Sequence, residues 1–293
     1  QGGVSAFQEA RIGEALLVGI SPKKYTVTLQ EAWVVRSLQG KIIVIIGGTS
    51  GIGLSAAQAV RAAGGKVVVM GRSRVKVKGA VRELGRAGRG LVGDAGKARS
   101  AGRAVSLAVR EFGRLDGLYH VAGGSGRAAG DGPLGEISDT GWEETLRHNL
   151  DSVFYSNRAA VRQFRRQDGG GAVLNLGSVL GFAPSPKFFA THAYAAAKAG
   201  IIGLTRAAAS HYAREDIRFN VLAPALVDTP MSERAQGDAE TMGYIERKQP
   251  LDGGRIGAPE DLDGAAVYLL SDAARAVTGQ VLSVDGGWSV SEG

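Results

Sequence analysis

The apolar positions of this chain form short continuous runs, separated by longer stretches that have a helical repeat. The first two runs are KIIVII (residues 41–46) and KVVVM (residues 66–70), and neither alternates apolar with polar positions. Continuous apolar runs of this length are typical of parallel strands that are buried on both faces. Further runs follow at residues 90–94, 114–123, 171–178, 217–224 and 279–287, each after a stretch with helical periodicity.

This alternation of strands and helices predicts the fold class. Crossover connections between parallel strands place helices on both faces of a sheet. The sequence therefore predicts a single α/β domain over residues 38–293, a doubly wound parallel sheet of the Rossmann type. Residues 1–37 do not share the repeat, and we expect an N-terminal extension there, either an added element packed on the domain or a loosely ordered segment.

A glycine-rich segment directly follows the first predicted strand. IIVIIGGTSGIG has the order strand, tight turn and helix start, and the amides at a helix N-terminus attract a pyrophosphate. Gly47 would permit the turn, Gly51 the close approach of the phosphate, and Gly53 the packing of helix on strand. We therefore expect a dinucleotide site here, with Ser50 and Ile52 also among its contacts.

The end of the second predicted strand bears on the choice between NAD and NADP. An acidic residue at this place, about twenty residues after the glycines, usually holds the ribose 2′-hydroxyl of NAD. This chain has Gly71 followed by Arg72, and an arginine can bind a 2′-phosphate through two hydrogen bonds. NADP is therefore the preferred cofactor in this prediction, with NAD as the alternative. Arg74, Lys76 and Lys78 can also be interpreted as the solvated start of a helix.

Tyrosine and lysine occur four residues apart in two places. Tyr194 and Lys198 lie in HAYAAAKAGI, where the alanines favour a helix that would place both side chains on one face. Tyr244 and Lys248 have the same spacing in GYIERKQP. At most one of these pairs is expected to be catalytic, and the shared spacing leaves the choice between them open.

The composition excludes several other classes of site. The chain has 293 residues, no cysteine and four scattered histidines, so we expect neither a disulfide nor a metal site. Its net charge of +7 is spread over predicted helix faces, which argues against nucleic acid as a partner. No apolar run reaches membrane-spanning length, and residues 1–20 lack the order of a secretory signal, so we expect a cytoplasmic protein.

In their order, these segments resemble the short-chain dehydrogenases/reductases over residues 38–293. IGGTSGIG is similar to the glycine motif of that family, with Ile46 in place of a threonine. HVAG places His120 and Val121 where the family has two asparagines, and NVLAPALVDTP has Ala225 in place of a glycine. The resemblance implies a homo-oligomer, a tetramer or a dimer, and further cofactor contacts from Asp94, Ala95, Ala122, Gly123, Tyr194, Lys198, Pro224, Val227 and Thr229.

The resemblance also implies a catalytic set, consisting of Asn149, Ser178, Tyr194 and Lys198. It thereby selects the Tyr194 pair, which follows a predicted buried strand and Ser178 and opens a long helix, and it makes Tyr244 a lid or surface residue. Tyr194 would exchange a proton with a small-molecule substrate, and the Lys198 ammonium and the oxidised nicotinamide would favour its phenolate. Lys198 would also bind the nicotinamide ribose, Ser178 would hydrogen-bond the substrate oxygen, and Asn149 would hold a water that connects Lys198 to solvent. The implied reaction interconverts a carbonyl and a secondary alcohol by hydride transfer.

Two other functions are alternatives. One is the reduction of a carbon–carbon double bond in an enoyl thioester, and the other is a non-catalytic dinucleotide sensor. Such proteins often alter or lose part of the catalytic set, whereas all four positions are present in this chain. The sequence leaves the substrate and the direction of the reaction open, because Phe182, Phe188, Phe189 and Tyr244 could form either a pocket wall or part of the core.

Overall fold

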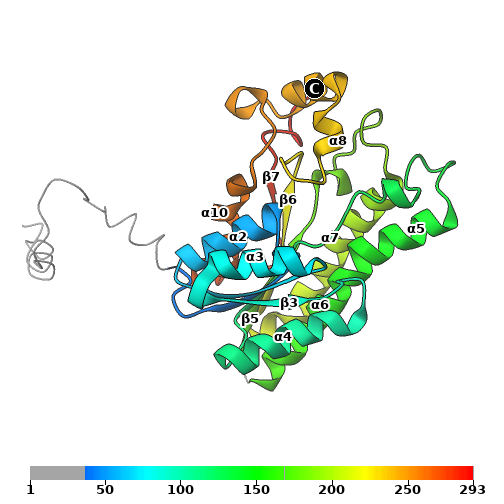
Figure 1. The fold of residues 1–293 in the computed structure, drawn as a ribbon. Coiled ribbons are helices and arrows are strands. Elements are labelled where there is room, and N and C mark those ends of the chain that lie inside the picture. The colour runs from blue at the N-terminus through cyan, green and yellow to red at the C-terminus, as the bar shows by residue number, and fades with distance from the viewer. Residues whose placement is uncertain (1–36, 168, 293) are drawn as a thin grey trace, which may run out of the picture.

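The computed structural model describes residues 37–167 and 169–292, and Figure 1 shows their arrangement. Within these residues, seven parallel strands form one sheet in the order β3-β2-β1-β4-β5-β6-β7. The strands are β1 (Ile42–Ile46), β2 (Lys66–Gly71), β3 (Gly88–Val92), β4 (Gly117–His120), β5 (Gly171–Leu176), β6 (Ile217–Pro224) and β7 (Val281–Val284). The predicted extension, residues 1–37, lies outside the described residues apart from Ser37.

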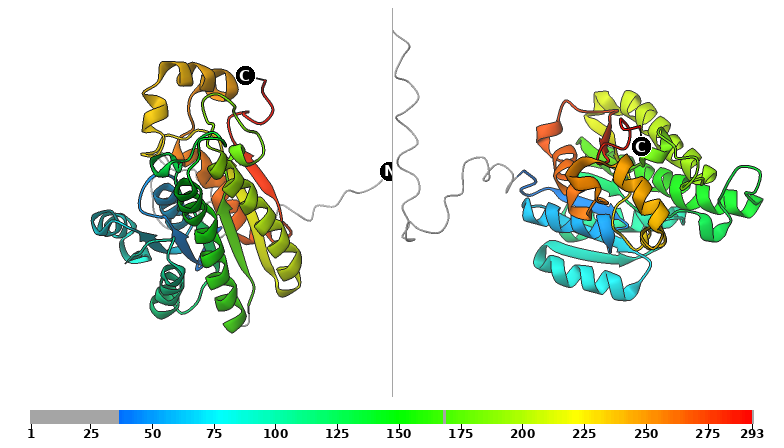
Figure 2. Two further views of the ribbon diagram at one scale, coloured as in Figure 1. Left: turned by 90° about the vertical axis from the view of Figure 1, so that its right-hand side faces the viewer. Right: turned by 90° about the horizontal axis from the view of Figure 1, so that it is seen from above.

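Helices cover both faces of this sheet. One face carries α2 (Gly51–Ala62), α3 (Arg74–Leu84) and α10 (Asp263–Leu270). The opposite face carries α4 (Ala98–Phe112), α6 (Ser152–Arg166) and α7 (His192–Tyr212), and the views in Figure 2 show the sheet between the two layers. The predicted doubly wound α/β fold is therefore confirmed.

Strand β1 illustrates why the apolar runs are continuous. Ile43 and Ile45 point to the face that α2 and α10 cover, whereas Ile42 and Val44 point to the face that α4 and α6 cover. Every residue of β1 is buried. Because successive side chains of a strand alternate between its faces, burial on both sides requires an apolar residue at every position.

The remaining helices lie near the carboxyl ends of the strands. They are α5 (Asp139–Leu146), which precedes α6, and α8 (Glu233–Gln236) and α9 (Ala239–Lys248), which both come from the segment between β6 and α10. That segment, yellow to orange in Figure 1, stands beyond the carboxyl ends of β6 and β7. It therefore lies on the side of the sheet where open α/β folds bind their ligands.

Candidate active site

A large cleft lies at the carboxyl edge of the sheet, where the strand order reverses between β1 and β4. Its volume is about 560 Å³. Thirteen of the residues that the sequence predicts for the site line it: Gly47, Ser50, Gly51, Ile52, Arg72, Asp94, Ala95, Ala122, Gly123, Asn149, Tyr194, Lys198 and Thr229. The predicted residues therefore meet around one cleft although they are far apart in the sequence.

The turn between β1 and α2 needs glycine at two places. Gly47 has a φ of 91°, and a Cβ there would lie 2.6 Å from the backbone nitrogen of Ala122. Gly53 does not line the cleft, and a Cβ on it would collide with the carbonyl oxygen of Gly47. The first glycine keeps β1 and β4 close together and the second allows α2 to begin directly against the turn.

Basic side chains lie at the end of the cleft formed by β2 and α3. Arg72, Ser73 and Lys76 all line it, and the Ser73 hydroxyl accepts a hydrogen bond from the Lys76 amide at 3.4 Å. Arg74 and Lys78, in contrast, are not among the lining residues. Lys76 lies four residues after Arg72, and its sequence context is equally compatible with a solvated helix start, so only the folded structure shows that it lines the cleft.

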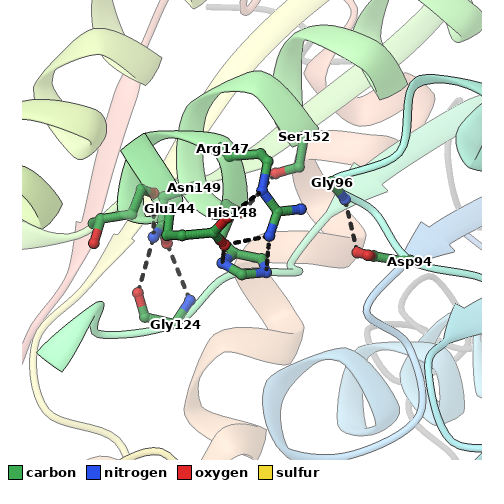
Figure 3. Close-up of polar contacts among 9 residues, drawn as sticks. Asp94, Gly96, Gly124, Glu144, Arg147, His148, Asn149 and Ser152 are labelled. Carbon is green, nitrogen blue, oxygen red and sulfur yellow. Dashed lines mark hydrogen bonds and ion pairs between the residues drawn. The ribbon is translucent and has the colours of Figure 1, made fainter. Parts of the chain in front are cut away.

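Asn149 lies in a π-helical turn (Arg147–Asp151) that joins α5 to α6. Its side-chain nitrogen donates to the carbonyl oxygens of Gly124 and Thr145, both at 2.9 Å, and its oxygen accepts from the Gly124 amide at 3.1 Å. Figure 3 shows the Asn149 side chain directed at Gly124, with the ion pair between Glu144 and Arg147 beside it. The loop after β4 is thereby fixed to the helix that follows.

Tyr194 and Lys198 lie one turn apart near the start of α7, and both are buried. Lys198 Nζ lies 5.3 Å from the centre of the Tyr194 ring and donates to the carbonyl oxygen of Leu176 at 2.8 Å. A Cβ on Gly123 would lie 2.6 Å from Asn149 Oδ1 and 3.9 Å from Lys198 Nζ, so the asparagine and the lysine flank the same glycine.

Burial changes the proton affinity of both side chains. It raises the pKa of Tyr194 to about 12, against the opposing effect of a hydrogen bond with the Ser178 side chain. It lowers the pKa of Lys198 to about 7. Both shifts favour the uncharged form, because a buried charge loses its hydration. In this structure burial is the largest effect on the Tyr194 pKa.

A smaller cavity of about 130 Å³ adjoins the cleft. Ser178, Pro224 and Val227 line this cavity and not the cleft, whereas Ile52, Tyr194 and Thr229 line both. Its wall also contains apolar side chains, among them Val179, Leu180, Phe189 and Trp288. Tyr194 thus stands between a cleft of dinucleotide size and a cavity with an apolar wall.

The second Tyr–Lys pair lies elsewhere, on α9. The Tyr244 ring is half-buried against Phe188 and Trp288, with ring centres 4.8 and 5.7 Å away, and Lys248 donates to the carbonyl oxygen of Ser291. Neither Tyr244 nor Lys248 lines the cleft or the smaller cavity. Of the four aromatic residues that the sequence suggested for a pocket wall, Phe189 alone lines the smaller cavity.

Comparisons with known proteins identify the family. A family model described as "Enoyl-(Acyl carrier protein) reductase" matches residues 47–289. The chain is 32% identical over 255 residues to a 2-dehydro-3-deoxy-D-gluconate 5-dehydrogenase of Dickeya dadantii, covering 86% of this chain and 96% of that protein. It is 34% identical over 261 residues to 3beta-hydroxysteroid dehydrogenase 1 of Eggerthella lenta, covering 87% and 96%. A solved short-chain type dehydrogenase/reductase from Mycobacterium ulcerans superimposes with a TM-score of 0.80 at 32% identity, covering 87% of this chain and 92% of that one.

The chain belongs to the short-chain dehydrogenase/reductase family. It is therefore an oxidoreductase, and members of this family use a nicotinamide dinucleotide. Among the described residues, no helix has the length and apolar character needed to cross a membrane, and no group of three or more His, Asp or Glu side chains could hold a metal ion.

His120 is the main departure of this short-chain dehydrogenase/reductase from the asparagine pattern expected after β4. Its Nε2 lies 3.0 Å from the carbonyl oxygen of Ala122 and its Nδ1 lies 2.7 Å from the Ser156 hydroxyl on α6. Because a carbonyl can only accept, Nε2 carries the proton. Burial and the nearby Lys198 charge lower the pKa of His120 to about 3, so it is neutral and links β4 to α6.

Sequence reasoning missed three polar residues of the short-chain dehydrogenase/reductase site. Arg127 and Arg234 line the smaller cavity, and the carboxylate of Asp131 accepts hydrogen bonds from the amides of Ala193 and Tyr194, both at 3.0 Å. They come from the glycine-rich segment 123–132 and from the short helix α8, where no periodicity predicts which way a side chain points. The signal that could have drawn attention to Arg127 is its isolation as the one charged side chain between Gly123 and Gly130.

Proposed function

We propose that this enzyme interconverts a carbonyl and a secondary alcohol with NADP as its preferred cofactor, using Asn149, Ser178, Tyr194 and Lys198. The observation that carries this proposal is the position of Tyr194, which lines the large cleft together with Lys198 and the smaller cavity together with Ser178. A single hydroxyl therefore borders both the space that suits a dinucleotide and the space that suits a small molecule.

The cleft fits a nicotinamide dinucleotide. The turn after β1 leaves no room for a Cβ on Gly47, and the start of α2 offers backbone amides to a pyrophosphate. Ser50, Gly51 and Ile52 would hold the phosphates, Asp94 and Ala95 the adenosine, and Ala122, Gly123 and Lys198 the nicotinamide half. Pro224, Val227 and Thr229 would bound the nicotinamide on the side of the smaller cavity. The bound cofactor supplies the hydride donor or acceptor.

The protein's own residues supply the proton chemistry. With a pKa near 12, Tyr194 holds its proton at neutral pH and can donate it to the oxygen of a carbonyl as reduction proceeds. The Ser178 hydroxyl, which hydrogen-bonds Tyr194, can donate to the same oxygen and stabilise the charge that develops there. Lys198, one turn after Tyr194 on α7, can return a proton to the tyrosine, and Asn149 would hold a water that connects Lys198 to solvent.

A carbonyl assay with both cofactors tests the reaction class. Purified protein should oxidise NADPH in the presence of ketones and leave enoyl thioesters unreduced. Reduction of the enoyl thioesters alone would instead support the alternative function, in line with the description of the matching family model. The names of the relatives do not select a substrate, because one refers to a sugar acid and another to a steroid.

Cofactor choice has its own test at Arg72. NADPH should bind at least about tenfold tighter than NADH, which corresponds to about 1.4 kcal/mol. Arg72→Asp should narrow or reverse that difference, because an acid repels the 2′-phosphate and can accept from a 2′-hydroxyl. Arg74→Asp makes the same charge change two residues on, off the cleft, and serves as the control. Equal or tighter binding of NADH by the unmodified protein in titration calorimetry would refute the preference.

Two wider expectations remain predictions. The resemblance implies a homo-oligomer, and the sequence of residues 1–20 leads us to expect a cytoplasmic location. Trp142 on α5 and Phe154 on α6 are exposed, which supports an interface between copies of the chain. Light scattering of the purified protein should therefore give a mass of two or four chains.

A further inference from the structure

Two arginines project into the smaller cavity from opposite parts of the chain. Arg127 lies in the 3₁₀ turn (Arg127–Ala129) after β4, and Arg234 lies on α8. The rest of the wall near them is mainly apolar, with Val179, Leu180 and Trp288 among its side chains. A small cavity with an apolar wall and two guanidinium groups has the composition of a site for an organic anion.

Neither arginine has an acidic partner within residues 37–167 and 169–292. Arg127 Nη2 donates to the carbonyl oxygen of Phe188 at 3.2 Å and forms no ion pair, so Asp131 offsets its charge only through space. The nearby Asp131 carboxylate is occupied at both oxygens by the first amides of α7. Asp238 caps α9 through the amides of Glu240 and Thr241 and forms no ion pair with Arg234.

The two positive charges also act on each other. Partial burial lowers the pKa of Arg127, and the charge of Arg234 lowers it further, while Asp131 opposes the shift. Two arginines that repel each other across a partly desolvated space are stabilised when an anion binds between them. Since each guanidinium can bind a carboxylate through two hydrogen bonds, a carboxylate group placed between the two arginines could accept from both.

We propose that the substrate carries a carboxylate which Arg127 and Arg234 bind while its carbonyl or alcohol carbon lies at Ser178 and Tyr194. This inference rests on the proposed function of the same site. The volume of about 130 Å³ restricts the substrate to a small keto or hydroxy acid, with its carbon skeleton against the apolar wall. Arg127 and Arg234 then determine specificity, because a neutral substrate leaves both charges without a partner.

Keto acids and their methyl esters provide a matched test. With saturating NADPH, 4-oxopentanoate and 4-oxocyclohexanecarboxylate should each have a kcat/KM at least about tenfold above that of the methyl ester, mainly through a lower KM. Arg127→Met and Arg234→Met should each lower kcat/KM for the acids by about ten- to a hundredfold more than for the esters. Arg103 is exposed on α4 and lines neither the cleft nor the cavity, so Arg103→Met should leave the ratio of kcat/KM for the acid to kcat/KM for its ester unchanged.

Binding measurements separate this inference from the proposed function. Calorimetry should show that the NADP⁺-loaded protein binds 4-oxocyclohexanecarboxylate at least about tenfold tighter than its methyl ester. Tighter binding of the acid without turnover of any carbonyl compound would overturn the proposed reaction and support the anion site. An ester bound and reduced as well as the acid, or arginine variants that weaken both equally while melting like the unmodified protein, would overturn the anion site.

Discussion

Tyr194 and Lys198 are both buried, and burial favours the neutral form of each side chain. Tyr194 keeps its proton well above neutral pH, whereas Lys198 can lose its proton near pH 7. A neutral tyrosine is the acid that carbonyl reduction needs, and the opposite reaction needs the phenolate. The sequence predicts this pair from its spacing together with its position after a buried strand and Ser178. The depth at which the two side chains lie depends on how α7 packs on β6 and on the 3₁₀ turn after Ser178.

A pair of tyrosine variants tests the catalytic assignment. Tyr194→Phe removes one hydroxyl, so the protein should fold and bind cofactor while turnover falls by about 10²–10⁴-fold or more. Tyr244→Phe removes the same atom from a ring that packs against Phe188 and Trp288, away from both cavities, and should change turnover by less than about threefold. The measurement is steady-state turnover with a ketone and NADPH. Near-normal turnover of the first variant, or a folded but inactive second variant, would reverse the assignment.

His120 predicts acid sensitivity of the fold. Its pKa is about 3 in the protein and near 6.5 in an unfolded chain, so below pH 6.5 the unfolded chain binds one more proton. The stabilising contribution of the neutral histidine is therefore present above pH 6.5 and is lost as pH falls, by at most about 1.4 kcal/mol per pH unit. Urea unfolding between pH 4 and 7 should show a shallower loss of stability for His120→Asn than for the unmodified protein. An equal dependence of the free energy of unfolding on pH in the two proteins would contradict this role of His120.

At the scale of elements, α7 begins against a carboxylate from a distant part of the chain. Thr191, the residue before the helix, makes no side-chain capping bond, and Asp131 accepts from the amides of Ala193 and Tyr194 instead. The same loop also contacts His192, whose Nδ1 accepts from the Leu134 amide at 2.9 Å. Asp131 thus positions the backbone of Tyr194, the residue that we propose as the catalytic acid.

Variants of Asp131 test this positioning role. Asp131→Ala leaves two buried amides at the start of α7 without an acceptor, which should cost about 1–3 kcal/mol of stability. Turnover should fall at temperatures where the variant is fully folded, because the Tyr194 hydroxyl moves with its backbone. Asp131→Asn keeps one side-chain oxygen that can accept a hydrogen bond, so it should lose less stability and less turnover than Asp131→Ala. Thermal unfolding and kcat measured together check this, and an Asp131→Ala enzyme with normal kcat would show that the loop acts on stability alone.

Elements that local residues determine can be predicted from the sequence, whereas elements that depend on contacts with distant residues cannot. Strands such as β1 and β2 can be recognised in the sequence, because burial on both faces requires an unbroken apolar run. The π-helical turn around Asn149 has no such pattern, since its register depends on contacts with Gly124, which is 25 residues away. For the same reason Arg127 and Arg234 could not be predicted as neighbours: they meet only after β4 and β6 have paired with β5 on either side.

At the scale of the whole molecule, the boundary proposed at residue 38 can be tested by truncation. Leu38 is fully buried, and its amide donates to the carbonyl oxygen of Ala63 at 3.0 Å. A protein that begins at Ser37 keeps these contacts and the complete sheet. It should be soluble, melt within a few degrees of the full chain and keep most of its turnover. Loss of turnover in a folded truncation would show that residues 1–36 belong to the functional unit.

The strand order has a consequence for synthesis on the ribosome. Strands β1, β2 and β3 are neighbours in both the sequence and the sheet, so they can pair as soon as they emerge. The other edge of β1 stays unpaired until β4, whose Gly117 pairs with Ile43, has been made, and until then it exposes unpaired backbone amides and carbonyls. An incomplete chain that ends before residue 117 is therefore a template for aggregation, and a chaperone would be needed most during this interval.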